Sequence, residues 1–197
     1  MKEYNLPVIA EADASPEVAK LYAQFREIFA RPRVPGILQC FATHPPLLEH
    51  MVGLAQSMLF SDGALGRTNK ELIATFVSAR NRCEYCADSH GSSLRTSGAS
   101  PALLAAALAC DLHSPAVDAA KSALLAFVQK VTDDSESILP EDVNKLRAFS
   151  WSDLQIAEAI HLAALFACFN RVVNAFGLPS QGLLDPGAGP HSLRGPG

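Results

Sequence analysis

The sequence of 197 residues has few charged or aromatic residues and no strand-like pattern. Charged residues make up 18% and aromatic residues 7%, against 49% that are hydrophobic, a balance typical of globular rather than disordered proteins. The basic residues are scattered and the formal net charge is −4, which excludes the basic surface that nucleic acid or an anionic membrane would need. No alternation of apolar and polar residues is long enough for a strand. We therefore expect an all-α fold.

Membrane spans and a secretory leader are also missing. No stretch reaches the roughly 18 uninterrupted apolar residues of a transmembrane helix. The start of the chain carries acids and two prolines where a signal peptide has an apolar core, so we expect a cytoplasmic protein. In that compartment five cysteines rarely form a disulfide framework, which leaves reactive, metal-binding or buried roles. No flavin, haem or nucleotide motif is present, and we expect no cofactor.

Helix-start signals and apolar spacing predict a series of helices. Ser15 followed by Pro16 places a capping residue before a proline at the first helical position, and Thr68 with Glu71 three residues later has the pattern of a capping box. The predicted helices cover about residues 16–29, 37–42, 47–60, 69–80, 83–97, 100–112, 114–132, 140–147 and 152–176.

A faint internal repeat runs through these helices. Glu71 lies twelve residues before Cys83, and Glu158 lies twelve before Asn170, each after a similar apolar run. This spacing predicts one domain, residues 1–178, with a motif-bearing half at about 37–112 and a related half at about 115–178. Residues 179–197 hold four prolines and five glycines. We expect them to form an arm that lies across a neighbouring subunit of a homo-oligomer.

The chemistry-bearing residues are Cys83, Cys86 and His90. On one helix, Cys83 and Cys86 share a face at i,i+3, and His90 joins Cys86 at i,i+4. The first turn of a helix offers free N–H groups and partial positive charge, which lower the pKa of a cysteine thiol. Glu71 lies too far from Cys83 along one continuous helix, about 18 Å. It reaches His90 only if the chain reverses near residue 82, and we expect that break.

Two thiols three residues apart suit peroxide reduction. One thiolate attacks the peroxide and becomes a sulfenic acid, and the second thiol condenses with it to a disulfide. A histidine moves the protons and a carboxylate orients it. Because Cys86 is nearer to His90 in the sequence, it is the expected attacking thiol, with Cys83 resolving and Glu71 orienting His90. An organic hydroperoxide is the expected substrate, and an external thiol or dithiol supplies the electrons.

The segment resembles the core motif of the AhpD-like, peroxidase-related branch of the carboxymuconolactone decarboxylase superfamily. The Glu-x11-Cys-x2-Cys-x3-His spacing is reproduced by Glu71, Cys83, Cys86 and His90, and the Phe-Asn-Arg segment ending at Arg171 is similar to another stretch of that branch. The resemblance covers about residues 35–178. It implies an all-helical bundle, trimers or hexamers, and alkylhydroperoxidase activity with the more C-terminal cysteine attacking.

One position departs from that family. The best-known members have a relay histidine directly before the second cysteine, where this sequence has Tyr85. Tyr85 can donate a hydrogen bond but is a poor base near neutral pH, so it is a supporting residue at most.

Other interpretations stay open. The same four motif residues could bind zinc, although a second CxxC or HxxxH is absent. The chain could also be a purely structural helical oligomer, or exchange disulfides without reducing peroxides. The remaining cysteines, Cys40, Cys110 and Cys168, lie in apolar runs and are expected in the core. For Asn170, inside an apolar helix, we expect hydrogen bonds at a subunit or repeat interface.

Overall fold

The computed structural model describes residues 4–185, which contain helices and turns but no strand. The all-α prediction is confirmed. The nine α-helices of this part are α1 (Pro16–Phe29), α2 (Gly36–Phe41), α3 (Pro45–Ala55), α4 (Arg67–Arg80), α5 (Glu84–Thr96), α6 (Pro101–Leu108), α7 (Ala119–Asp133), α8 (Pro140–Ala148) and α9 (Asp153–Phe176). A π-helical turn, Gln56–Phe60, extends α3.

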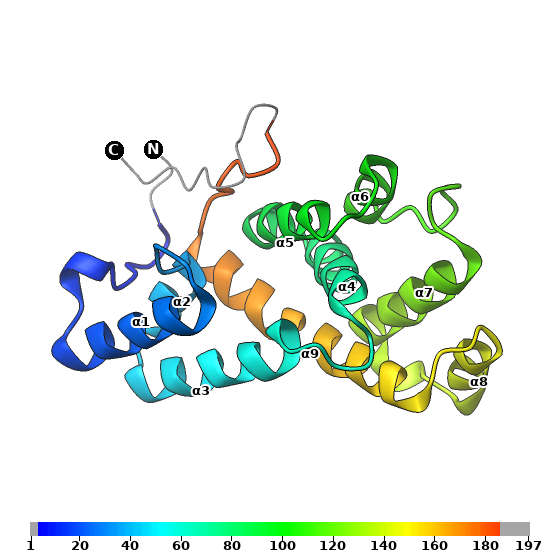
Figure 1. The fold of residues 1–197 in the computed structure, drawn as a ribbon, viewed down its shortest axis with the longest axis horizontal. Coiled ribbons are helices and arrows are strands. Elements are labelled where there is room, and N and C mark those ends of the chain that lie inside the picture. The colour runs from blue at the N-terminus through cyan, green and yellow to red at the C-terminus, as the bar shows by residue number, and fades with distance from the viewer. Residues whose placement is uncertain (1–3, 186–197) are drawn as a thin grey trace.

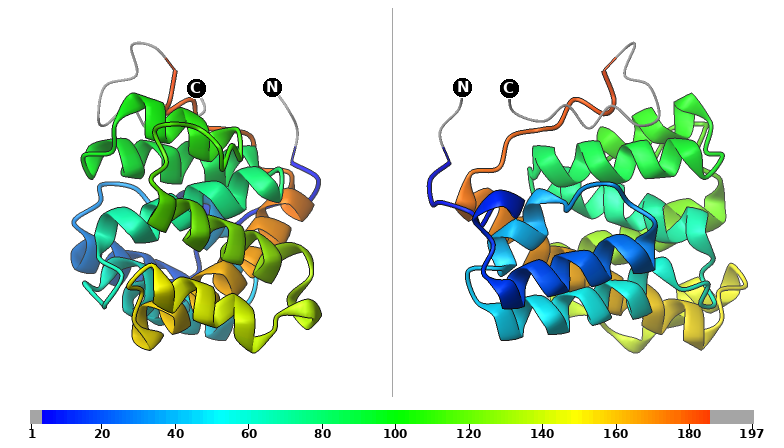
Figure 2. Two further views of the ribbon diagram at one scale, coloured as in Figure 1. Left: turned by 90° about the vertical axis from the view of Figure 1, so that its right-hand side faces the viewer. Right: turned by 60° about the vertical axis from the view of Figure 1, so that its left-hand side comes forward.

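Helices α4 and α9 form the centre of the bundle. Helices α1 to α3 gather at one end, α7 and α8 at the other, and α9 runs between the two ends (Figure 1). The turned views show α5 and α6 on the outer side of α4 (Figure 2). Every residue from 70 to 78 of α4 is buried, because α5, α6, α7 and α9 all pack against this helix.

The chain reverses between α4 and α5. Arg82 adopts a left-handed conformation with φ of 54°, and the Cys83 N–H donates to the Ser78 carbonyl at 2.9 Å. Both features are typical of a helix C-terminus that turns back sharply. The predicted break near residue 82 is confirmed, and it makes α4 and α5 an antiparallel pair.

Helix α9 is capped at both ends. A capping box joins Ser152 and Gln155 at its start, and Gly177, with φ of 79°, ends it. By length and composition α9 is the one helix within residues 4–185 that could cross a membrane. Half of its apolar window is buried inside the protein, and it packs against α2, α4 and α7. It is therefore a core helix of the bundle.

Two predicted helix starts were wrong. Residues 114–117 form turns instead of helix, because the Ser114 hydroxyl accepts from the nearby Ala116 N–H at 3.3 Å. Asp118 then caps α7 by accepting from the Lys121 N–H. At the head of α4 the predicted capping box does not form. The helix begins after Gly66, and Thr68 donates its hydroxyl to the carbonyl of residue 97 instead.

Both ends of the described chain pack on the helices. Asn5 donates its N–H to the Phe176 carbonyl at 2.9 Å and its amide to the Ala175 carbonyl at 3.2 Å. Residues 178–185, here called the strap, run from the end of α9 along α5 (Figures 1 and 2). The arm was predicted to need a neighbouring subunit, but through residue 185 it lies on its own chain. Residues 186–197 lie outside the described part, and the homo-oligomer stays a prediction.

Candidate functional site

The two motif cysteines lie at the head of α5. Cys83 is the N-cap residue, and Cys86 follows in the first turn. Both are free thiols, and their exposed fractions are only 0% and 4%. They form a small cluster whose other members are Ile37, Tyr85, Val173 and Leu178. The thiols are thus adjacent to each other, as the spacing predicts, and are enclosed by apolar side chains.

The two thiols differ in acidity. Hydrogen bonds from the Cys86 thiol and backbone N–H lower the pKa of Cys83, against the effect of burial. The pKa of Cys86 is raised, because its thiol is held in the bond to Cys83 and is itself buried. The partial positive charge of the helix N-terminus also lowers the pKa of Cys83. These directions point to Cys83 as the thiolate, whereas the spacing from His90 pointed to Cys86, so the roles of the two thiols stay a prediction.

Glu71 and His90 meet across the α4–α5 hairpin. His90 Nδ1 lies 2.8 Å from Glu71 Oε2, although the two residues are 19 apart in the chain. On its other side the carboxylate is paired with Arg67, at 2.6 Å between Nη2 and Oε1. The Glu71 side chain is completely buried and that of His90 is 19% exposed. The predicted approach of Glu71 to His90 is confirmed.

This arrangement fixes the charge of Glu71 and the orientation of His90. Burial alone would raise the pKa of Glu71, but the His90 and Arg67 interactions outweigh it and lower the pKa below its ordinary value. An ionised Glu71 accepts a hydrogen bond from a protonated Nδ1 of His90. This tautomer leaves Nε2 of His90 for proton transfer. The ring is held further by an edge contact with Phe166, at 4.7 Å between centroids.

Asn170 joins the two related halves of the chain beside this site, as the expected hydrogen bonds at a repeat interface predicted. It comes from α9 and is fully buried. Its Oδ1 accepts from Asn81 Nδ2 at 2.9 Å, and its Nδ2 donates to Ser78 Oγ at 3.1 Å. The same carboxamide acts to lower the pKa of both Cys83 and Cys86, and Val173, one turn further along α9, packs against the two cysteines. The one signal for it in the sequence was the repeat, in which Asn170 mirrors Cys83.

Tyr85 packs against the start of α2. Its hydroxyl is buried without a hydrogen-bond partner of good geometry, close to Gly36. Burial raises the pKa of the phenol, so Tyr85 is not a base in this structure. Its contribution to the cluster is the ring, which packs beside the two thiols.

The strap covers α5 beside the cysteines. The buried Asp88 carboxylate accepts three of its backbone N–H groups, from Gln181, Leu183 and Leu184, at 2.8 to 3.1 Å. Leu184 lies so close to Gly91 that a side-chain carbon there would be 2.8 Å from it. Leu178, where the strap begins, packs against the cysteine cluster. The strap therefore closes one side of the thiol site.

The outcomes for the other cysteines are mixed. Cys40 is buried as expected, whereas Cys110 is half-buried. Cys168 was predicted in the core but is exposed, because it lies on the outer face of α9.

Within residues 4–185 no three His, Cys, Asp or Glu side chains are grouped to hold a metal ion. The alternative zinc site therefore has no support in the described chain, where Glu71 and His90 bind each other.

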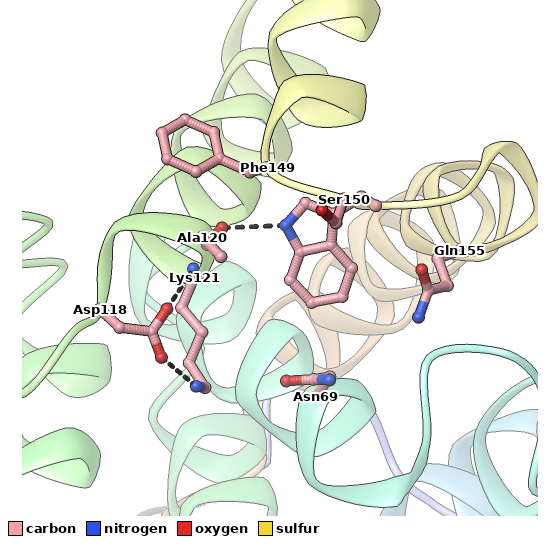
Figure 3. A pocket seen from close by; sticks show the side chains of 8 residues that line it. Asn69, Asp118, Ala120, Lys121, Phe149, Ser150 and Gln155 are labelled. Carbon is pink, nitrogen blue, oxygen red and sulfur yellow. Dashed lines mark hydrogen bonds and ion pairs between the residues drawn. The ribbon is translucent and has the colours of Figure 1, made fainter.

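A surface pocket of about 270 Å³ lies away from the thiols, where the first turns of α4, α7 and α9 meet the α8–α9 loop (Figure 3). Its polar groups bind one another. Trp151 Nε1 donates to the Ala120 carbonyl, and Lys121 pairs with Asp118. Cysteine and histidine are absent from its lining, so the dithiol site is the stronger candidate for chemistry.

Comparison with known proteins finds one family match and several similar structures. Residues 45–129, which include all four motif residues, match the model of the carboxymuconolactone decarboxylase family. A comparison with curated proteins finds no match. Among solved structures, the chain is similar to the alkylhydroperoxidase AhpD core of an uncharacterized peroxidase-related protein from Ralstonia eutropha JMP134. The TM-score is 0.80 and the identity 22%, over 91% of this chain and 93% of that one.

Two further structures have the same fold. An uncharacterized peroxidase-related protein from Silicibacter sp. TM1040 is 25% identical over 91% of this chain and 94% of that one, with a TM-score of 0.77. The debrominase Bmp8, in complex with 2,3,4-tribromopyrrole, is 17% identical over 98% and 96% of the two chains, with a TM-score of 0.73. The chain therefore matches the carboxymuconolactone decarboxylase family model over residues 45–129 and has the fold of these peroxidase-related proteins over about nine tenths of its length.

Proposed function

We propose that this protein is a thiol-dependent peroxidase that reduces an organic hydroperoxide through Cys83 and Cys86. The observation that carries the proposal is geometric: two adjacent free thiols, Cys83 and Cys86, lie at the head of the helix whose His90 is held by a buried carboxylate. A thiolate is the nucleophilic form of cysteine, and a neighbouring thiol resolves the sulfenic acid that it forms. The similarity to peroxidase-related proteins supports the same reaction.

In the proposed cycle the Cys83 thiolate attacks the outer peroxide oxygen. The O–O bond breaks, Cys83 becomes a sulfenic acid, and the alkoxide takes a proton and leaves as an alcohol. The Cys86 sulfur then attacks the Cys83 sulfur, and a disulfide forms as the S–O bond breaks. The hydroxide that leaves takes the proton of Cys86 and becomes water. An external dithiol returns the disulfide to two thiols by exchange.

His90 is the proposed proton carrier in this cycle. Its Nε2 accepts the thiol proton, directly or through one water, and returns it to the alkoxide. The ionised Glu71 supports this role, because it holds Nδ1 in its protonated form and stabilises the imidazolium. Arg67 in turn keeps Glu71 ionised.

The surroundings of the thiols favour an apolar peroxide. The side chains of Ile37, Val173 and Leu178 enclose the sulfurs, and such a wall binds an alkyl group better than a charged one. We therefore propose an alkyl or aryl hydroperoxide in preference to a charged substrate.

The test is a count of free thiols before and after a slight excess of cumene hydroperoxide. It uses the reduced protein with Cys83→Ser and Cys86→Ser alongside. Wild type should lose two thiols per chain and form the Cys83–Cys86 disulfide. Cys86→Ser should stop at a sulfenic acid on Cys83, which a dimedone probe traps, and Cys83→Ser should react no faster than free cysteine. Wild-type loss as slow as that of free cysteine would contradict the proposal.

Two controls separate the alternatives. Reduction of a model disulfide without any reaction with peroxide would make the chain a disulfide-exchange protein. Release of bromide from 2,3,4-tribromopyrrole, with the dithiol supplying two electrons, would align it with the debrominase whose fold it shares.

A further inference from the structure

The carboxamide of Asn170 is held in one orientation. Its oxygen accepts from Asn81 Nδ2 at 2.9 Å, and its nitrogen donates one hydrogen to Ser78 Oγ at 3.1 Å. Both partners lie at the end of α4, and Asn170 itself is fully buried. A carboxamide nitrogen carries two hydrogens. With the first bound to Ser78, the second is available to the nearby thiols, because the Ser78 carbonyl accepts from the Cys83 N–H at 2.9 Å and Val173, one turn along α9, packs against both cysteines.

Two charged side chains near the reversal give the thiols no support, since Arg80 binds elsewhere and the charge of Glu84 acts to raise the pKa of Cys83. Arg80, which directly follows the buried part of α4, points outward and binds Asp133, at 2.9 Å between Nε and Oδ2. Arg67 is paired with Glu71. A neutral donor beside a thiolate in this enclosed place stabilises it, because hydrogen bonds to an ionised group are about twice as strong as those between neutral groups.

We propose that Asn170 is a third member of the dithiol site, which donates its second Nδ2 hydrogen to whichever sulfur carries the negative charge. The inference rests on the proposed redox role of Cys83 and Cys86. In that cycle Cys83 is charged first, and Cys86 acquires charge when it attacks the sulfenic acid. One donor placed against both sulfurs stabilises each thiolate in turn without moving.

The second half of the internal repeat also has a role in this arrangement. Glu158 and Asn170 stand in the second half where Glu71 and Cys83 stand in the first. The second half has no cysteine pair of its own, and it supplies a hydrogen-bond donor to the cysteines of the first half instead.

The measurement is the pKa of Cys83, independent of any peroxide. In reduced protein, the rate at which iodoacetamide alkylates Cys83 is followed against pH by peptide mass spectrometry. Asn170→Leu removes the donor while keeping the volume, and Asn170→Asp replaces it with an acceptor. We expect alkylation near pH 7 to fall about tenfold in Asn170→Leu, since one bond to a charged group corresponds to about one pKa unit, and further in Asn170→Asp.

The matched control is Asn174→Ala. Asn174 lies one turn further along α9 and donates to the Asn81 carbonyl at 3.3 Å, so its loss should leave the pKa of Cys83 unchanged. Circular dichroism checks that each variant folds. If neither Asn170 variant folds, the alkylation rate of Cys83 is measured in Ser78→Ala instead. This substitution removes the hydroxyl that holds the Asn170 carboxamide in its orientation.

Slower alkylation in Ser78→Ala would then support the proposal, and an unchanged rate would overturn it. A folded Asn170→Leu with the wild-type pKa for Cys83 also overturns it. Because this readout involves no peroxide, it separates the role of Asn170 from the outcome of the peroxidase test.

Discussion

Glu71 Oε2 and His90 Nδ1 lie 2.8 Å apart on two antiparallel helices, at a place where the carboxylate has no contact with solvent. The pair exists because the chain reverses at Arg82, which brings the middle of α4 level with the middle of α5. A buried carboxylate needs a partner for each oxygen. His90 bonds to one oxygen and Arg67 forms an ion pair with the other, so the Glu71–His90 pair contributes to stability and to the proposed proton transfer.

The stability of the protein should fall as the pH drops below about 4. The pKa of Glu71 is lowered in the folded state, since its bonds to His90 and Arg67 outweigh the effect of burial. A group of this kind stabilises the fold above its unfolded pKa, and that stabilisation is lost as the pH falls through the folded pKa. Thermal melts from about pH 7 to pH 3 measure it. The Glu71→Gln variant should have a lower melting temperature near pH 7, and its melting temperature should fall less than that of wild type as the pH drops. An equal fall in both proteins would show that Glu71 is not the group responsible.

Asp88→Ala should release the strap and expose the thiols. The carboxylate accepts three backbone N–H groups, and we expect its loss to cost about 1–3 kcal/mol in the free energy of unfolding. Cys83 and Cys86 should then react faster with Ellman's reagent, because Leu178 packs against them. Ser89→Ala is the control, since it removes only the bond from Gln181 Nε2. If the folded Asp88→Ala protein reacts at the wild-type rate, the strap does not limit access.

Tyr85→Phe should leave stability and thiol reactivity nearly unchanged. The hydroxyl is buried without a hydrogen-bond partner, so its removal relieves a desolvated group and should change the free energy of unfolding by less than about 1 kcal/mol. Urea denaturation and the alkylation rate of Cys83 measure the two effects. A folded variant that consumes hydroperoxide much more slowly would show that the hydroxyl takes part in the reaction.

Glu158→Ala should destabilise the protein without affecting the thiols. Its carboxylate accepts from the N–H groups of Ala64 and Leu65 at 2.8 and 2.9 Å, and it lies 3.9 Å from the buried ammonium of Lys70. We expect a loss of about 2–4 kcal/mol in urea denaturation, because a charged group would be left buried. Lys70→Met added to Glu158→Ala should recover part of it. If the double variant recovers none of the lost free energy of unfolding, the whole loss comes from the two hydrogen bonds to the backbone.

The sequence predicted the part of the site that depends on local geometry. The spacing of Cys83, Cys86 and His90 is meaningful on any helix, and a reversal near residue 82 was the one way to bring Glu71 to them. These inferences needed no knowledge of distant packing. The order of the thiol acidities was not accessible in this way, because it depends on how two buried sulfurs share one hydrogen bond.

Other features depend on contacts between distant segments. Asn170 and Ser78 are 92 residues apart, and an asparagine in an apolar helix indicates only that it is hydrogen-bonded, not to what. The contact of Asp88 with Leu184 spans 96 residues, and nothing local to either residue predicts it. The start of α7 was missed for a smaller reason, since Ser114 and Asp118 both fit a helix cap and the chain uses the second.

The strap has a practical consequence for anyone who expresses this protein. Purification tags are fused to chain ends, and the described segments nearest the two ends are bound to the helices. Residues 181–184 are bound to the helix that carries the cysteines, while Asn5 is bound to the end of α9. A fused peptide that displaces residues 181–184 therefore disturbs one wall of the dithiol site. Turnover and thiol reactivity should be compared between tagged and cleaved protein before either is attributed to the enzyme.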